Sequence, residues 1–349
     1  MVVRVYLKQA WNLMKQNPLF STLYIVGTGI SIVMTMVIAI VYYVRLAPVY
    51  PETNRMRTLV VKSAKMTNDE STHSANISYA MLKDWFYSLE SAEVSTGVFG
   101  TSYARVTNDK EEIPTYARYT DENFFRVFPL VFLEGKPFTE ADRRSGIHNV
   151  VLTDSYAQQL FGTTKGVVGK NFLMDYTNVK VVGVVKSGSF LTPDSYAQVY
   201  LPYSCRDGYD DEGSHWALGG YRVYILMKES KSVTDVQDEV LELVRKFNVS
   251  DMGDGWKLDL VGQPELYWHS TFRLWSNVAV DWGRVIWMFV GIFMVLLFVP
   301  AFNLSGMISA RMERQLPDLG IRKAFGASRR RLLVQIIWEN LLLTGLGTL

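Results

Sequence analysis

Uncharged apolar residues gather near the two ends of the chain, and the first long run covers residues 19–44. A helix of that length rises roughly 39 Å, which exceeds the hydrocarbon core of about 30 Å. The run is too long for the apolar region of a signal peptide and ends at Arg45 without a small-residue cleavage site. The pattern therefore predicts an uncleaved transmembrane helix over residues 19–44.

A second uncharged run occupies residues 285–310, and a third begins at Leu332 and reaches the last residue, Leu349. The second run predicts another transmembrane helix. The third contains Glu339 and Asn340. We therefore interpret it as the start of an incomplete third span, in a chain that looks truncated.

Basic residues flank these runs on one side. Residues 1–18 contain Arg4, Lys8 and Lys15 without an acid, and residues 311–331 are also rich in arginine. Both segments are predicted to be cytoplasmic, because basic residues favour that side of the membrane. The first is expected to lie as an amphipathic helix on the membrane lipid. The segment between the spans, residues 45–284, is then extracytoplasmic.

The extracytoplasmic segment alternates strand-like and helix-like patterns. The pattern predicts two strand–helix–strand units, one early and one late, that enclose an inserted part over residues 116–203. The predicted fold class is a membrane protein with α-helical spans and a large α+β outer domain. A single cysteine, Cys205, offers no internal disulfide, so this domain must be held by its own core.

An aromatic stripe precedes the second apolar run. Trp268, Phe272, Trp275 and Trp282 recur at four- and three-residue steps that place them on one face of a helix. The spacing predicts a stalk helix over residues 265–310, which continues from the outer domain into the second span.

The cytoplasmic segment 311–331 carries signals for a short helix of its own. Pro317 suits the first turn, Gly326 suits the position after the last turn, and Asp318 can pair with Arg322 four residues later. The preference of basic residues for the cytoplasmic side explains the arginines, but it does not explain the positions of Pro317 and Gly326. The candidate coupling segment comprises Pro317, Asp318, Leu319, Gly320, Ile321, Arg322, Lys323, Ala324, Phe325, Gly326 and Ser328.

Composition and short motifs mainly exclude classes of function. The net charge of +2 makes no case for nucleic-acid binding, and the four histidines show no metal-ligand spacing. The glycine-rich stretch at residues 162–171 lacks the Gly-Lys-Ser/Thr ending of a phosphate-binding loop. We therefore predict no catalytic, cofactor or metal site within this chain.

The order of several motifs carries a family resemblance over nearly the whole chain. The stretch PDLGIRKAFGAS from Pro317, with Glu339 eleven residues after Ser328, resembles the signature of ABC transporter permease subunits of the MacB/FtsX/LolC type. Asp318 stands where that family usually has Glu. The stretches FLEGKPFTEAD from Phe132 and VVLTDSYAQQLFG from Val150 resemble its MacB-like periplasmic core.

The resemblance implies a multi-pass inner-membrane protein with a cytoplasmic N-terminus. Its outer domain would combine a Porter-like α/β part with an inserted β-rich Sabre-like part. ATP and Mg²⁺ would be bound by a separate ABC ATPase subunit, which would dock on the coupling segment and drive export or extraction by mechanotransmission. A homodimer or a heterodimer with another permease is expected. The resemblance leaves undecided whether a periplasmic adaptor and an outer-membrane channel are also partners.

Two other classes of function stay open at this stage. One alternative is a membrane sensor, and the other is a regulator of cell-wall hydrolases. In both, the outer domain binds a ligand or partner. No residue in segment 45–284 selects a substrate.

Overall fold

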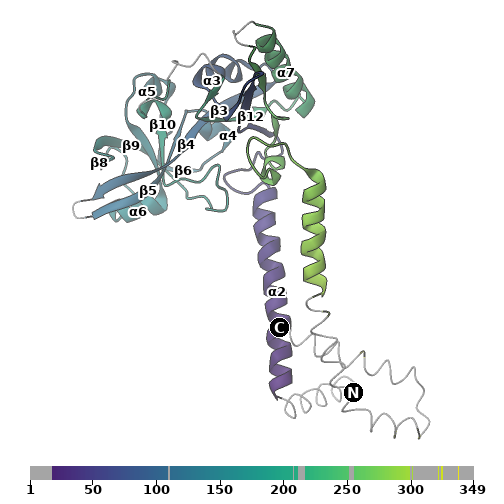
Figure 1. Ribbon diagram of the computed structural model, residues 1–349. Helices are drawn as coiled ribbons and strands as arrows, with labels where there is room; N and C mark the ends of the chain where they lie inside the picture. The colour runs from purple at the N-terminus through teal and green to yellow at the C-terminus, as the bar shows by residue number, and fades with distance from the viewer. Residues whose placement is uncertain are drawn as a thin grey trace. The chain divides into compact units, whose positions relative to one another are not determined.

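The computed structural model describes residues 18–108, 111–206, 208–210, 217–250 and 255–298, together with the isolated positions 301, 321, 324 and 337. The chain divides into two compact units. One comprises Met1–Tyr42 with Trp282–Leu349, and the other comprises Tyr43–Asp281. The second unit contains the predicted outer domain almost entirely (Figure 1).

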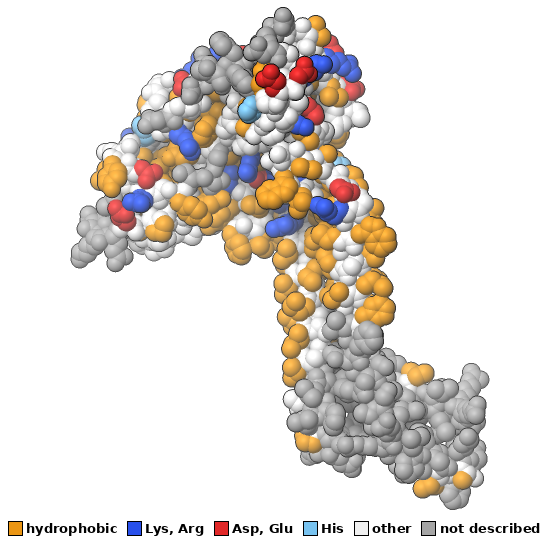
Figure 2. All heavy atoms as spheres, in the orientation of Figure 1, with side chains coloured by type: hydrophobic (Ala, Val, Ile, Leu, Met, Phe, Trp, Pro, Cys, Tyr) orange, Lys and Arg blue, Asp and Glu red, His pale blue; other side chains and the backbone are white. Residues whose placement is uncertain are grey.

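Two apolar helices belong to the first unit. Helix α2 spans Pro18–Leu46, and a second helix is described over Trp282–Phe298. The Tyr42 and Phe289 rings lie 5.0 Å apart between these helices. Hydrophobic side chains cover the outside of both (Figure 2). Among the described residues, only the window Gly29–Leu46 is long and apolar enough to cross a bilayer, with a mean hydropathy of 2.0.

The outer unit is built on one 14-stranded sheet, with the main strand order β13-β2-β3-β12-β4-β5-β10-β7-β9-β6. Its strands are β1 Thr58–Val61, β2 Ala64–Thr67, β3 Thr72–Ile77, β4 Ala92–Asn108, β5 Glu111–Thr120, β6 Phe132–Gly135, β7 Asn149–Thr153, β8 Asn171–Met174, β9 Thr177–Val185, β10 Val199–Pro202, β11 Leu218–Gly219, β12 Tyr221–Met227, β13 Lys257–Asp259 and β14 Glu265–Leu266.

Short helices cover this sheet. They are α3 Tyr79–Asp84, α4 Phe124–Val127, α5 Glu140–Arg144, α6 Asp154–Phe161 and α7 Val233–Val249, with 3-10 turns η1 Phe86–Ser88, η2 Tyr203–Cys205 and η3 His269–Phe272. Figure 1 shows α3 and α7 beside β3 and β12, whereas α5 and α6 lie at the other end of the sheet. The late predicted strand–helix–strand unit is present as β12-α7-β13. The early one, expected from a strand at residues 57–64, is present as β1, α3 with η1, and β4, but β2 and β3 come between β1 and α3.

Hydrophobic cores lie on both faces of the sheet. In β1, Leu59 and Val61 belong to one core and Val60 to the other, and all three are fully buried. This explains why β1 is a continuous apolar run, since alternation disappears when both faces of a strand are covered. Strand β1 lies between β12 and β14, antiparallel to both.

Two sequence-based boundaries need correction. The boundary at position 116 falls inside β5, which pairs with β4 from Glu111 to Thr120, so strands of the predicted insert continue the common sheet. The uninterrupted stalk helix over 265–310 is wrong in its first part. Residues 265–281 form β14, η3 and irregular turns, and the helix begins at Trp282. Pairing of β14 with β1 requires extended backbone there, which overrides the helical spacing of the aromatic residues.

Candidate functional site: two arginine clamps beside strand β1

The chain leaves helix α2 through a buried arginine. Arg55 turns its guanidinium back toward the helix, and its Nη1 donates to the carbonyl oxygens of Val44 at 2.5 Å and Ala47 at 2.9 Å. Carbonyl groups in the last turn of a helix have no intrahelical partner, so a buried donor satisfies them directly. We call Arg55, its partner Glu52 and these two carbonyls the Arg55 clamp.

Glu52 fixes the guanidinium and extends the clamp into the outer domain. The Arg55 Nε donates to Glu52 Oε2 at 2.8 Å, and the Ser195 hydroxyl donates to Glu52 Oε1 at 2.6 Å. The Glu52 and Arg55 side chains are 0% and 2% exposed. Burial raises the pKa of Glu52, although the Arg55 charge and the Ser195 hydrogen bond oppose the shift. The end of α2 is thereby joined to a loop far away in sequence.

A second clamp holds the segment that leads to the helix starting at Trp282. The Arg273 guanidinium donates to the carbonyl oxygens of Val278 at 2.6 Å and Val261 at 2.9 Å, and its Nε pairs with Glu265. The Arg273 and Glu265 side chains are only 3% and 8% exposed. These four residues form the Arg273 clamp, which ties the connecting segment to β14.

Both clamps converge on β1. Glu265 lies opposite Val60 in the β1–β14 pair, and the Tyr267 amide donates to the Thr58 carbonyl oxygen at 2.8 Å. The Tyr267 ring also lies 5.3 Å from the Arg55 guanidinium carbon, within cation–π range. Strand β1 is therefore linked to both clamps, directly through Glu265 and indirectly through Tyr267.

The loop that contacts Glu52 is itself held by charge. Asp194 pairs with Lys62 at 2.9 Å, and Arg118 donates to the carbonyl oxygens of Pro193 at 2.6 Å and Tyr196 at 2.9 Å. Burial alone would raise the pKa of Asp194, but the neighbouring Lys62 ammonium holds it below its usual range. Asp194 therefore stays ionised, and the loop forms a rigid support for the Arg55 clamp.

A separate buried polar cluster surrounds Asp121 and is structural in character. Its carboxylate accepts hydrogen bonds from the Thr96 hydroxyl at 2.6 Å, the Tyr87 hydroxyl at 2.6 Å and the Gly97 amide at 2.8 Å. Burial raises the pKa of Asp121 to about 6, against the effect of these hydrogen bonds. The folded protein thus binds a proton at Asp121 more readily than the unfolded chain.

This cluster predicts a defined pH dependence. Between pH 7 and pH 4, protonation of Asp121 should stabilise the folded state by about 2 kcal/mol, because its pKa is raised from 3.8 to about 6. Asp121→Asn cannot titrate and should lack this gain. Urea unfolding of both proteins across this pH range, followed by tryptophan fluorescence, isolates the contribution of Asp121 to the free energy of unfolding, since other groups contribute equally to both. Parallel stability profiles would contradict it.

The residues singled out from sequence have mixed outcomes. In the coupling segment, the structure describes only Ile321 and Ala324, both helical and exposed, and the remaining positions lie outside the described residues. The stalk aromatics do not form one helical stripe. Trp268 and Phe272 pack 6.4 Å apart around η3, Trp275 is 67% exposed in a connecting segment, and Trp282 begins the helix.

Sequence reasoning missed Arg55 and Arg273 altogether. The available signal was weak: a Glu-x-x-Arg pair soon after the first apolar run, and an arginine shortly before the second. Among the described residues, no group of three His, Cys, Asp or Glu side chains could hold a metal ion. The clamps instead fix the two segments that lead to the apolar helices.

The described residues thus combine a large α/β unit with one helix that is long and apolar enough to cross a membrane. Comparison with protein families adds the particular class. Residues 20–243 match the MacB-like periplasmic core domain, and residues 277–349 match the FtsX-like permease C-terminal domain. The chain therefore belongs to the MacB/FtsX type of ABC transporter permease, an inner-membrane class with an extracytoplasmic domain.

Curated relatives are similar at modest identity. The pyoverdine export ATP-binding/permease protein PvdT of Pseudomonas fluorescens Pf0-1 is 24% identical over 244 residues, which cover 67% of this chain and 33% of the relative. The macrolide export ATP-binding/permease protein MacB of Escherichia coli K12 is 21% identical over 244 residues, covering 70% and 35%. The matched region thus spans about a third of each relative's length.

Solved structures are also similar, at lower identity. The periplasmic region of MacB from Actinobacillus actinomycetemcomitans is 16% identical, with coverage of 57% of this chain and 88% of that one and a TM-score of 0.41. A domain of a putative permease from Porphyromonas gingivalis is 15% identical, with coverage of 59% and 89% and a TM-score of 0.39.

Proposed function

We propose that this chain transmits movement from a separate ABC ATPase subunit to its own outer domain. The observation that supports this most directly is the pair of clamps. Each of the two segments that connect the outer unit to an apolar helix is fixed by a buried arginine, and both fixings meet at β1. A displacement of either helix would therefore be passed to the sheet rather than absorbed by a loose linker.

The proposed topology follows from charge. Residues 1–18 and 311–331 lie in the cytoplasm, and residues 45–284 lie outside. The segment Pro317–Ser328 docks on the ATPase subunit, which binds ATP and Mg²⁺. The family match to the FtsX-like permease domain supports this assignment, because it includes the segment.

We infer the direction of transport from the names of the relatives. Relatives at 24% and 21% identity are named for pyoverdine and macrolide export. We propose export or extraction of a substrate by a pair of permease chains, with an adaptor and an outer-membrane channel as candidates for further partners. Movement passed through the clamps would act on the outer domain, so the substrate need not pass between the membrane helices.

The docking proposal predicts loss of the ATPase from the complex. The double variant Arg322→Glu/Lys323→Glu should lower co-purification with the ATPase subunit at least about tenfold, because two like-charge contacts replace attractive ones at the interface. Pull-down of the detergent-solubilised full chain, with stimulated ATP hydrolysis as a second readout, measures the effect. Arg105→Glu, which changes an exposed arginine of the outer domain, serves as the matched control. Unchanged ATPase binding by the double variant would refute the docking assignment.

A further inference from the structure

Two turns of the outer unit carry large apolar side chains at their tips. Phe190 lies in a turn closed by the Thr192 amide, which donates to the Ser189 carbonyl oxygen at 3.0 Å, and it is 74% exposed. Leu274 and Trp275 lie in a second turn and are 62% and 67% exposed. We call these three side chains the apolar tips. Large apolar residues that gather on an exposed surface mark a site of contact with a membrane or a protein.

The two clamps hold these turns in place. Ser195, which donates to Glu52 in the Arg55 clamp, lies in the same loop as Phe190. In the second turn the Val278 amide donates to the Trp275 carbonyl oxygen at 3.2 Å, and the Val278 carbonyl oxygen in turn accepts from the guanidinium of the Arg273 clamp at 2.6 Å. The tips are therefore presented at fixed positions, which limits the conformational entropy lost when they bind.

Both turns adjoin the segments that lead to the apolar helices. The outer unit includes the last turn of α2, which ends at Leu46, and the nearby Tyr50 hydroxyl donates to the Lys186 carbonyl oxygen at 2.8 Å. Trp275 precedes the start of the second helix at Trp282 by seven residues, which span at most about 25 Å. Figure 2 shows hydrophobic side chains gathered on the side of the outer unit where α2 ends. The apolar surface thus continues outward from a helix that is apolar enough to cross a bilayer.

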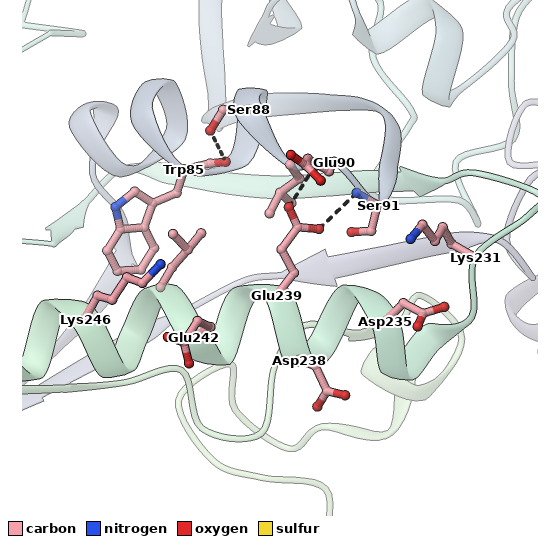
Figure 3. A pocket seen from close by; sticks show the side chains of 12 residues that line it. Trp85, Ser88, Glu90, Ser91, Lys231, Asp235, Asp238, Glu239, Glu242 and Lys246 are labelled. Carbon is pink, nitrogen blue, oxygen red and sulfur yellow. Dashed lines mark hydrogen bonds between the residues drawn. The ribbon is translucent and has the colours of Figure 1, made fainter.

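The exposed charge around the first tip is basic. Arg45 in the last turn of α2 and Lys186 before the Phe190 turn are exposed, whereas the neighbouring acids Glu52 and Asp194 are buried. The groove beside α7, shown in Figure 3, has the opposite character, because five carboxylates and two lysines line it. Phosphate groups of lipids attract bases and repel acids. The charge therefore suits a lipid surface on the side of the tips and not on the side of α7.

We propose that the apolar tips insert into the interfacial layer of the extracytoplasmic leaflet, with Arg45 and Lys186 beside lipid phosphates. Tryptophan is enriched at this depth of membranes, where part of its ring meets the apolar chains. The proposal rests on the proposed topology, but it does not depend on the transmission of movement. It makes the outer domain a body that is fastened to the lipid at two further points besides its helices.

The test places a nitroxide label on the full chain in vesicles of phosphatidylethanolamine and phosphatidylglycerol. The background variant Cys205→Ser removes the single native cysteine, and the label is attached after Phe190→Cys or Trp275→Cys. Tyr176→Cys is the matched control, because Tyr176 is an aromatic residue that is 83% exposed in the turn between β8 and β9.

The expected result is a difference in the collision rates of the label with oxygen and with a polar nickel chelate. The ratio of oxygen to chelate collisions should be at least about threefold higher at positions 190 and 275 than at 176, because a group about 5–10 Å deep in the headgroup and acyl boundary meets dissolved oxygen but excludes the chelate. Two labelled sites on separate turns keep the test decisive if one variant fails to fold.

The two collision rates also separate the alternatives. High access of both reagents at 190 and 275 would mean open water, and low access of both would mean contact with a protein, such as a second permease chain. Either result would overturn the proposal. The vesicles contain no ATPase subunit, so a failure of the proposed transmission cannot alter the outcome. The topology is measured separately in spheroplasts, where a membrane-impermeant thiol reagent should modify Tyr176→Cys. Absence of this modification would overturn the assignment to the extracytoplasmic leaflet.

Discussion

Replacement of Arg55 by methionine is expected to lower the free energy of unfolding of the outer domain by about 3–5 kcal/mol. Methionine preserves much of the side-chain volume but leaves the fully buried Glu52 carboxylate without its cation, and removal of one member of a buried pair costs about this much. The carbonyl groups of Val44 and Ala47 also lose their donor. Urea unfolding of the full-length protein in detergent, followed by tryptophan fluorescence, measures the change.

Three comparisons make this expectation specific. The double variant Glu52→Gln/Arg55→Met should recover at least half of the loss, because the glutamine is neutral and still accepts the Ser195 hydroxyl. The loss should shrink at lower pH, where the unpaired Glu52 takes up a proton. Arg105→Met removes an exposed pair with Glu112 at 3.8 Å and should cost at most about 1 kcal/mol. Equal losses from Arg55→Met and Arg105→Met would contradict the clamp.

The elements of the outer domain were predictable wherever local signals and packing agree. Helix α7 is an example: Ser232 caps its start, and Val236, Val240 and Val244 bury one face. The first apolar run likewise forms the single long helix α2. In such segments the hydrophobic period and the capping residue indicate the same structure, so tertiary contacts reinforce the local preference.

Residues 265–281 show where sequence reasoning failed. The aromatic spacing there matches a helix, yet Glu265 and Leu266 pair with Val60 and Leu59 across a gap of about two hundred residues. No local pattern encodes that pairing. The same is true of the clamps, because Arg55 and Arg273 act through backbone carbonyls, which every residue carries. The location of a buried arginine's partners depends on the fold and not on any motif.

The candidate site therefore divides into two parts with different support. The coupling segment around Arg322 was inferred from residue type and family resemblance, and most of it lies outside the described residues. The clamps were found from geometry alone. Together they describe the two ends of one proposed route, from an ATPase contact in the cytoplasm to a buried strand in the outer domain.

Replacement of Arg273 by leucine is expected to open the Arg273 clamp locally. Glu265 would lose its ion pair, and the carbonyl groups of Val261 and Val278 would lose a shared donor. A local loss of about 3 kcal/mol corresponds to roughly a hundredfold faster hydrogen exchange at the Tyr267 amide, which bonds to Thr58. Amides in the β4–β5 pair lie in a different part of the sheet and should keep their protection. Hydrogen exchange with mass spectrometry distinguishes the two regions.

The same variant tests whether the clamp carries movement. In complex with the ATPase subunit, wild-type protein should show an ATP-dependent change in exchange at β1 and β14, because both membrane-directed segments meet there. Arg273→Leu should retain ATPase binding and hydrolysis but lose most of this change, since the connecting segment no longer pulls on β14. Glu265→Gln/Arg273→Leu removes the unpaired charge without restoring the connection. It should therefore recover stability while remaining uncoupled, and recovery of the ATP-dependent change in this double variant would contradict a mechanical role for the Arg273 clamp.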